Sequence, residues 1–190
     1  MQYALIAEGN AMKIKNIFIT GAPGVGKTTL LQKVVADISQ HLRCGGFMTA
    51  EIRHAGSRVG FEVCSLDGRR AILAHRNFKT DQRVGRYGVD VSGFERFVLP
   101  LLDEPTIQLY LIDEIGKMEC FSDIVCRKVE SLLDSETPVL GSIAQKGEGF
   151  IRRVKMRRDV DIIEITRSNR DMLIAVLSEK VMHLVIRHAV

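Results

Sequence analysis

The chain of 190 residues contains no tryptophan and no stretch of about 20 uncharged apolar residues, so we predict no helix that spans a bilayer. Residues 1–12 include the short apolar run YALIA, but they have neither a basic n-region nor a small-residue cleavage site. That pattern does not match a secretory signal peptide. We therefore expect residues 1–12 to form an N-terminal tail, and we expect a cytoplasmic protein with no membrane partner.

Cysteine and histidine patterns typical of metal sites are also missing. The four cysteines include no C-x-x-C pair, and no histidine stands at ligand spacing from any of them. We predict reduced thiols and no zinc site. None of the five histidines neighbours a serine or a cysteine in a catalytic arrangement, so we interpret all five as structural or exposed.

Length and charge set broad limits on what remains. A chain of this length favours one domain, which we place at 13–190, and it should bury roughly 70% of the surface that the unfolded chain exposes. There are 27 Lys and Arg residues against 23 Asp and Glu residues, which gives a formal net charge of +4. That small excess suits anionic ligands but does not by itself indicate nucleic acid.

Short apolar runs alternate with amphipathic segments along most of the chain. The runs predict strands at 16–20, 46–52, 59–66, 70–75, 108–113, 138–144 and 161–166. Such alternation is typical of parallel β-α units in a three-layer α/β/α domain. One region differs, because residues 58–75 contain two strand patterns joined at Asp67-Gly68. This region predicts an antiparallel β-hairpin inserted into the α/β core.

Helical periodicity predicts helices at 28–42, 92–102, 121–134 and 169–187. The first has an apolar face composed of Leu30, Leu31, Val34, Val35, Ile38 and Leu42. In the second, Ser92 and Glu95 have the S-x-x-E spacing of a capping box.

The first predicted strand leads directly into GAPGVGKTT, in which Gly21-x-x-x-x-Gly26-Lys27-Thr28 fits the P-loop pattern. Glycines allow successive backbone N–H groups to point at phosphate oxygens, and the following helix adds its positive N-terminal end. We expect Lys27 to reach the β- and γ-phosphates and the Thr28 hydroxyl to bind Mg²⁺. The predicted nucleotide-binding residues are Gly21, Ala22, Pro23, Gly24, Val25, Gly26, Lys27, Thr28, Thr29, Asp113, Glu114 and Lys117.

Charged residues follow the buried strand pattern in LYLIDEIGKMEC, residues 109–120. Asp113 is the expected Walker-B carboxylate, which would contact Mg²⁺ through its water shell, so Thr28 and Asp113 are the predicted metal-binding residues. Glu114 is expected to orient or deprotonate the attacking water. Lys117 either neutralises charge in the transition state or forms an ordinary ion pair. Glu119 either serves the outer shell of the metal or caps the 121–134 helix. Lys27, Glu114 and Lys117 are the predicted catalytic residues.

These motifs carry a family resemblance. GAPGVGKTT together with IDEIGKME resembles the thermophile-type and cancer-related nucleoside-triphosphatase family, and GFMTAEIR, RVGFEVCSLDG, VGRYGVDVSGFE and S-N-R-D extend the similarity over about residues 14–175. The resemblance implies a P-loop NTPase fold and Mg²⁺-dependent hydrolysis of ATP, GTP and other nucleoside triphosphates, with loose base preference and slow turnover.

Three weaker patterns leave alternatives open. Thr49, Glu51 and Arg53 share one face of a strand, either near the γ-phosphate or on a solvated edge. The strand at 138–144 is expected to lie between the P-loop strand and the Asp113 strand, a RecA-like order in which Gln145 or Lys146 would sense the γ-phosphate. The basic run RRVKMRR, residues 152–158, is a solvated helix face, a lid, or an RNA-binding strip.

The predicted function is therefore hydrolysis of nucleoside triphosphates to the diphosphate and phosphate, with Mg²⁺ as the cofactor. A small-molecule or nucleoside kinase is the first alternative. A nucleotide-dependent RNA-binding switch is the second, although a nucleic-acid partner is not favoured by the sequence.

Overall fold

The computed structural model describes residues 14–188, and the predicted tail at 1–12 lies outside them. The strands are β1 (Asn16–Thr20), β2 (Cys44–His54), β3 (Ser57–Ser65), β4 (Arg70–His75), β5 (Arg83–Val84), β6 (Tyr87–Val89), β7 (Leu109–Ile115), β8 (Val139–Ile143) and β9 (Val160–Glu164). The helices are α1 (Lys27–Ile38), α2 (Val91–Leu101), the short 3₁₀ helix η1 (Glu119–Phe121), α3 (Asp123–Asp134), α4 (Phe150–Lys155) and α5 (Leu173–His188).

All of these strands belong to one sheet with the order β5-β6-β4-β3-β2-β7-β8-β1-β9. Strands β2, β7, β8, β1 and β9 pair in parallel and form the core of the sheet. Strand β8 lies between β1 and β7, which confirms the RecA-like order. Because the carboxyl ends of parallel strands meet at one edge of a sheet, this order brings the segments after β1, β7 and β8 together.

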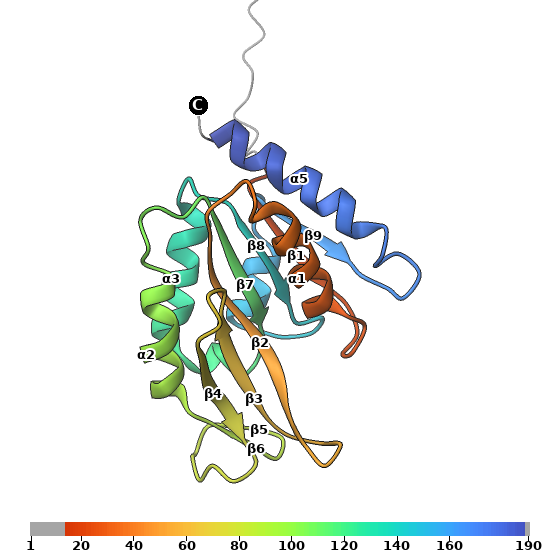
Figure 1. Ribbon diagram of the computed structural model, residues 1–190. Helices are drawn as coiled ribbons and strands as arrows, with labels where there is room; N and C mark the ends of the chain where they lie inside the picture. The colour runs from red at the N-terminus through yellow and green to blue at the C-terminus, as the bar shows by residue number, and fades with distance from the viewer. Residues whose placement is uncertain (1–13, 189–190) are drawn as a thin grey trace, which may run out of the picture.

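Helices cover both faces of the parallel core, which confirms the three-layer fold (Figure 1). Helices α1 and α5 pack on one face around Ile17, Ile19 and Leu111, while α2, α3 and α4 pack on the other face around Phe18, Phe47 and Ile112. Alternate residues of the central strands therefore point into two separate apolar layers. The predicted apolar face of α1 is buried as expected.

A buried amide fixes the register at the opposite edge of the sheet. Asn16 is fully buried; its Nδ2 donates to the carbonyl oxygen of Leu133 (3.2 Å) and to the Asp159 carboxylate (3.1 Å). Its Oδ1 accepts from the N–H of Val139 (3.1 Å). One side chain thus joins β1, α3 and β8, and the satisfied amide penalises a shift in strand register.

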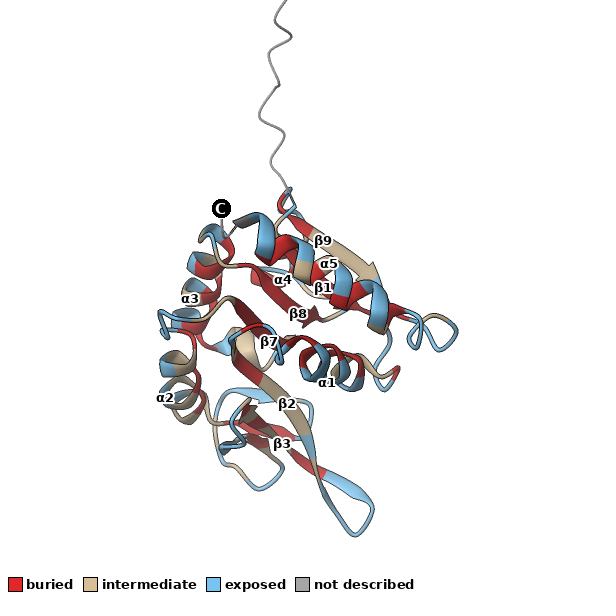
Figure 2. Cartoon of the chain, turned by 45° about the horizontal axis from the view of Figure 1, so that its top comes forward, coloured by how far each residue is buried: buried red, intermediate tan, exposed pale blue. Residues whose placement is uncertain are grey.

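The antiparallel part of the sheet is larger than an inserted hairpin. Strands β3 and β4 form the predicted hairpin, but β2 also pairs antiparallel with β3, and β4 continues into β6 and β5. The sequence pattern did not predict β5 and β6, because they are only two and three residues long and therefore too short for a period of two to show. Helix α2 packs on one face of this extension, while the tip of the β2–β3 hairpin projects away from the helices and is mostly exposed (Figure 2).

The predicted capping box of α2 is wrong, and of the two alternatives for Glu119 the helix cap is not observed. The N-cap of α2 is Asp90, whose carboxylate accepts from the N–H of Gly93 (2.9 Å), rather than Ser92 with Glu95. Glu95 instead accepts from the hydroxyl of Ser122 (2.6 Å), and Ser122 is the N-cap of α3. Glu119 therefore does not cap α3. Aspartate and serine are both preferred caps, so spacing alone could not decide between neighbouring candidates.

No helix within residues 14–188 has both the length and the apolar character that crossing a bilayer requires.

Candidate active site

The segment between β1 and α1 forms a tight loop in which Gly21, Gly24 and Gly26 have positive φ angles. A Cβ atom at Gly21 would lie 2.5 Å from the carbonyl oxygen of Ile165, so the close approach of β1 to the end of β9 requires glycine. Gly26, the N-cap of α1, has a φ of 107°, which a residue with a side chain adopts only under strain. Ala22, Pro23 and Gly24 lie exposed on the outside of the loop, whereas Val25 is buried beneath it.

The first turn of α1 keeps its amides available for a ligand. Gly26 provides no side-chain cap, and there is no acidic residue in the first turn. The initial N–H groups of a helix have no partner within the helix, and they favour an anion there. The loop and helix together are therefore suited to bind phosphate groups, as the sequence predicts.

Asp113 lies fully buried at the end of the parallel core, next to Ser142 from β8 and Thr28 from α1. The Ser142 hydroxyl donates a hydrogen bond to Oδ1 of Asp113. The other oxygen, Oδ2, is buried and has no hydrogen-bond partner of normal geometry among the described residues. The P-loop hydroxyl and the Walker-B carboxylate thus share one site, although they come from residues 85 positions apart, by subtraction of their numbers.

The environment of Asp113 disfavours its charged form. Burial raises the pKa of this carboxyl group to about 6, whereas the hydrogen bond from Ser142 and the nearby Thr28 hydroxyl act to lower it. The negative charge of Glu114 raises the pKa further, and the positive charge of Lys27 lowers it. A buried carboxylate with one unpaired oxygen costs free energy, and a bound cation would offset that cost.

This donor set fits Mg²⁺. Magnesium prefers oxygen ligands and usually retains several waters while it contacts one or two protein groups and the phosphates of a substrate. The unpaired Oδ2 of Asp113 and the Thr28 hydroxyl are the oxygens that the structure offers. No cluster of three or more His, Cys, Asp and Glu side chains that would bind a metal by themselves occurs in residues 14–188. A partly hydrated ion held jointly with phosphate oxygens matches both observations.

Glu114 lies beside the P-loop lysine. Its Oε2 is 3.7 Å from Nζ of Lys27, which also donates to the carbonyl oxygen of Gly21 (3.3 Å). The pairing of β7 with β8 shifts register between Ile112 and Ile115. Since this irregularity breaks the usual alternation of side chains, consecutive Asp113 and Glu114 both reach the site. The Lys27 side chain is 10% exposed and that of Glu114 is 31% exposed, so Glu114 has contact with water.

Glu119 joins this acidic group from the other side. Its Oε2 accepts a hydrogen bond from the N–H of Gly116 (3.0 Å), and a Cβ at Gly116 would lie 3.4 Å from Oε1 of Glu114. Burial of the carboxyl group is the main cause that raises the pKa of Glu119 to about 8, and the charges of Glu114 and Asp113 act in the same direction. Glu119 therefore shapes the turn after β7 and stands close to Glu114.

Lys117 is placed differently from the other predicted site residues. It is exposed, and no ion pair within residues 14–188 joins it to Glu114 or Glu119. It lines a separate cavity of about 380 Å³ between the β5–β6 turn, the segment after β7 and the segment after β8. In this structure Lys117 is thus not brought together with Lys27 and Glu114.

Strand β8 contributes to the site through Ser142, whereas the polar residues that follow the strand lie at the surface. Gln145 is exposed, and its Nε2 lies 3.5 Å from Oε1 of Glu164 at the end of β9. Its carbonyl oxygen accepts from Nζ of Lys155 (2.8 Å). Lys146 is also exposed. The predicted strand order is present, but a sensing role for Gln145 or Lys146 stays a prediction.

Arg53 lies in the antiparallel extension, at the turn between β2 and β3. Its guanidinium binds the Glu51 carboxylate (3.0 Å) and the carbonyl oxygen of Gly56 (2.9 Å), and Glu51 also pairs with Arg58. These exposed contacts satisfy the charges locally. Of the two alternatives for this face, the structure supports a solvated position.

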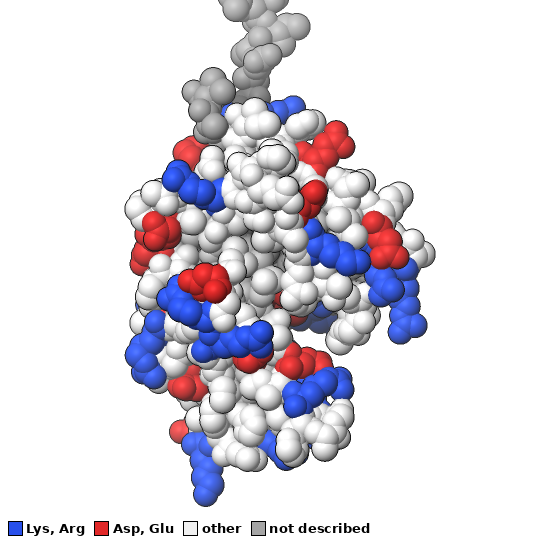
Figure 3. All heavy atoms as spheres, in the orientation of Figure 1, with Lys and Arg blue, Asp and Glu red and all other residues white. Residues whose placement is uncertain are grey.

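The basic run at 152–158 is mostly paired with acidic side chains. Arg153 lies 3.8 Å from Glu130, and Arg157 pairs with Asp134 (2.7 Å) and Asp159 (2.8 Å). The apolar side of α4 is buried. Elsewhere, on the face shown in Figure 3, Lys and Arg side chains also lie among Asp and Glu side chains. These pairings favour the solvated helix face over an RNA-binding strip.

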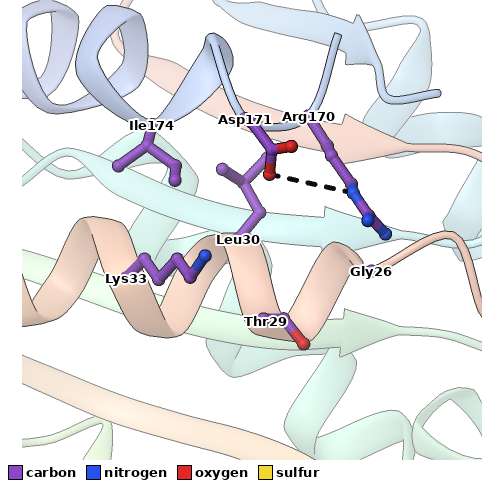
Figure 4. Close-up of a pocket in the computed structure, with 7 residues that line it drawn as sticks. All are labelled: Gly26, Thr29, Leu30, Lys33, Arg170, Asp171 and Ile174. Carbon is purple, nitrogen blue, oxygen red and sulfur yellow. Dashed lines mark ion pairs between the residues drawn. The ribbon is translucent and has the colours of Figure 1, made fainter. Parts of the chain in front are cut away.

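A second cavity, of about 160 Å³, lies between the start of α1 and the segment before α5 (Figure 4). Its lining consists of Gly26, Thr29, Leu30 and Lys33 from the P-loop and α1, and of Arg170, Asp171 and Ile174 from the segment before α5 and its first turn. Thr29, the last predicted nucleotide-binding residue of the loop, is exposed on its wall.

Comparison with known proteins identifies the family. A family model described as NTPase matches residues 16–178. The nucleoside-triphosphatase THEP1 of Thermotoga petrophila is 39% identical over 160 residues, which cover 83% of this chain and 88% of that protein. The cancer-related nucleoside-triphosphatase of Homo sapiens is 37% identical over 176 residues, covering 84% of this chain and 93% of that protein.

Solved structures of similar proteins support the same family assignment. The crystal structure of THEP1 from Aquifex aeolicus matches with a TM-score of 0.77 at 33% identity, covering 85% of this chain and 96% of that one. The solution structure of a human cancer-related nucleoside triphosphatase matches with a TM-score of 0.77 at 35% identity, covering 88% and 97%. The chain belongs to the NTPase family. The resemblance that the sequence motifs predict is confirmed.

The sequence patterns predicted no role for two residues of this NTPase that lie near the phosphate loop. Ser142 stands inside an otherwise apolar strand, and such a serine is a signal for a buried hydrogen bond. Arg170 belongs to the S-N-R-D motif, from which no role was predicted. No local pattern indicates that Arg170 lies against the P-loop, because that contact depends on where β9 joins the sheet.

Proposed function

We propose that this NTPase hydrolyses nucleoside 5′-triphosphates to the diphosphate and phosphate in a Mg²⁺-dependent reaction. The observation that carries the proposal is the meeting of Thr28, Asp113, Lys27 and Glu114 at one end of the phosphate loop. The names of the relatives, which are nucleoside-triphosphatases, support the same reaction.

Different residues bind the phosphates and the cation in this proposal. The loop amides and Lys27 bind the phosphates and stabilise the negative charge that develops on them. Thr28 and Asp113 hold the cation, and Ser142 fixes the orientation of Asp113 through its hydrogen bond. When bound, Mg²⁺ would neutralise charge on the β- and γ-phosphate oxygens.

Glu114 is the group that prepares the attacking water. Its carboxylate is partly exposed, so water reaches it, and it lies 3.7 Å from the ammonium group that binds the phosphates. It accepts a proton from the water as the water oxygen bonds to the γ-phosphorus, while the bond from that phosphorus to the β–γ bridging oxygen breaks and the nucleoside diphosphate leaves. The family resemblance leads us to expect slow turnover and broad acceptance of bases.

Phosphate release tests this proposal. Wild-type protein with ATP, GTP, CTP or UTP and Mg²⁺ should release phosphate without any acceptor, and Lys27→Ala should reduce the rate about 10²- to 10³-fold. A matched control is Lys79→Ala, which also removes a lysine but lies exposed in the segment after β4 and lines neither the phosphate loop nor the cavity beside it. Phosphoryl transfer to an added alcohol, with no release in its absence, would instead establish a kinase. At least tenfold acceleration by RNA would establish a nucleotide-dependent switch.

A further inference from the structure

The cavity lined by Arg170 lies where the far end of a bound polyphosphate would be. In the sheet order, β1 stands between β8 and β9. The groups for the cation and the water come from the β7 and β8 side of the P-loop, whereas the 166–172 segment follows β9 on the other side. A triphosphate whose γ-phosphate lies at Asp113 and Glu114 therefore has its nucleoside end directed toward this cavity.

The wall of the cavity offers a planar cation and aliphatic surface. Figure 4 shows Arg170 and Asp171 on one side, facing Thr29 and Leu30 on α1. Leu30 and Ile174 supply apolar lining. A Cβ atom at Gly26 would lie 3.7 Å from Nη1 of Arg170, so the guanidinium group rests close to the backbone of the phosphate loop itself.

The backbone before Arg170 is held by local hydrogen bonds, which fix the origin of its side chain. The Asn169 amide accepts from the N–H of Thr166 (2.8 Å) and donates to the carbonyl oxygen of Glu164 (3.0 Å). The Arg170 N–H donates to the carbonyl oxygen of Thr166 (3.2 Å). The guanidinium is engaged at its edge, where Nε lies 3.8 Å from the Asp171 carboxylate. The Arg170 side chain is 47% exposed, so part of its guanidinium surface is accessible to a ligand.

We propose that this cavity binds the nucleoside part of the substrate and that the Arg170 guanidinium stacks on the base. Guanidinium planes stack on bases of every type, because each base has a π-face. The inference rests on the function proposed above, and it names the residue that distinguishes a nucleotide from an inorganic polyphosphate.

The size of the cavity explains why such binding discriminates little between bases. Its volume of about 160 Å³ is smaller than the ~300–1,000 Å³ of clefts that enclose a drug-sized ligand. A base stacked on Arg170 would keep its hydrogen-bonding edges in water. Because selectivity between bases requires contacts to those edges, we expect ADP, GDP and CDP to bind with similar affinity.

Calorimetric titration with two stable ligands tests the proposal without hydrolysis. ADP and pyrophosphate, each with Mg²⁺, share their phosphates and differ in the nucleoside. Arg170→Ala should weaken ADP binding about 2- to 30-fold and change pyrophosphate binding less than about twofold. Arg167→Ala is the matched control, since Arg167 is exposed in the same segment and does not line the cavity. That variant should bind both ligands like the wild type.

Arg170→Lys separates stacking from charge. Lysine keeps the positive charge but has no planar face, so we expect ADP binding to remain weakened. Wild-type ADP affinity in Arg170→Lys would overturn the stacking role. Equal losses for ADP and pyrophosphate in Arg170→Ala, or no loss for either, would overturn the nucleoside site. Thermal unfolding of each variant shows whether it is folded, and a misfolded Arg170→Ala leaves the decision to Arg170→Lys.

Failure of this inference can be told apart from failure of the proposed function. Absence of phosphate release with normal ADP and pyrophosphate binding would contradict hydrolysis but keep the nucleoside site. Normal hydrolysis by the wild type, together with unchanged ADP affinity in Arg170→Ala, would support hydrolysis but contradict the nucleoside site.

Discussion

The two sides of the phosphate loop differ sharply in burial. On the side of β7 and β8, Asp113 and Ser142 are fully buried and joined by a hydrogen bond. On the side of β9, Arg170 and Asp171 are exposed, and their ion pair is 3.8 Å long. Buried polar groups with fixed partners hold one geometry, whereas exposed ion pairs contribute little free energy and adapt to a ligand.

This difference in burial suggests that one side of the phosphate loop serves hydrolysis and the other side serves binding of the nucleoside. In the proposed binding mode, the reacting end of the substrate meets groups whose positions are fixed before it binds, which is what electrostatic stabilisation of a transition state requires. In the same proposal, the nucleoside end meets an open cavity with a single planar cation, Arg170. An NTPase built in this way should be demanding about the triphosphate and tolerant of the base.

Removal of the buried carboxylate should have the largest effect. Asp113→Asn keeps the shape of the side chain but loses the charge that holds the cation, so we expect phosphate release to fall about 10²- to 10³-fold. Raising the Mg²⁺ concentration should recover only part of the loss. The matched control is Asp37→Asn on the exposed surface of α1, which should be as active as the wild type. Full activity in Asp113→Asn would assign the cation to other residues.

Loss of the hydrogen bond to Asp113 should have an intermediate effect. Ser142→Ala leaves Oδ1 of Asp113 buried without its donor, so we expect activity or Mg²⁺ affinity to fall about 10- to 100-fold. Ser178→Ala is a control of the same type, because Ser178 is buried in α5 and its hydroxyl has no partner within residues 14–188. For both variants, the rate of phosphate release should be measured as a function of the Mg²⁺ concentration. Equal behaviour of the two variants would remove Ser142 from the site.

The pH dependence of the free energy of unfolding should reveal the cost of burying the charged form of Asp113. Burial raises the pKa of Asp113 from 3.8 to about 6, so between these values the native state binds more protons than the unfolded state. The free energy of unfolding of the metal-free protein should therefore contain a contribution from Asp113 that falls as the pH rises from about 4 to about 6.

Denaturant unfolding of the wild type and Asp113→Asn in EDTA isolates this contribution. Because the asparagine does not titrate, the difference between the two proteins should grow in favour of the variant by at most about 3 kcal/mol between pH 4 and pH 7. If the difference in the free energy of unfolding did not change with pH, the pKa of Asp113 would not be raised in the native state. Added Mg²⁺ should stabilise the wild type more than the variant at pH 7.

The smallest effect is expected in the antiparallel extension. Arg53→Ala removes exposed contacts to Glu51 and Gly56, so the free energy of unfolding should change by about 0.5 kcal/mol or less. Phosphate release should stay within about twofold of the wild type. A loss of tenfold or more, with stability unchanged, would place Arg53 at the reaction centre.

The same contrast between regions explains what the sequence could predict. The parallel core and the P-loop carry strong local patterns, so β1 was predicted with its observed bounds, and the meeting of Thr28 with Asp113 followed from motif spacing. The antiparallel extension was predicted only in part, because β5 and β6 are too short to show a period of two. The cavities that Lys117 and Arg170 line depend on how distant segments pack, and no short motif encodes that packing.

The Glu114→Gln variant tests the central claim, that a divalent ion and a water-activating carboxylate act on one bound triphosphate. Phosphate release from ATP in a single turnover should be measured beside the binding of the same Mg²⁺–ATP to this variant. Glutamine keeps the shape of the side chain but accepts no proton, so binding should stay within a few-fold of the wild type while the hydrolysis rate falls about 10²- to 10³-fold. Unchanged hydrolysis would contradict the account.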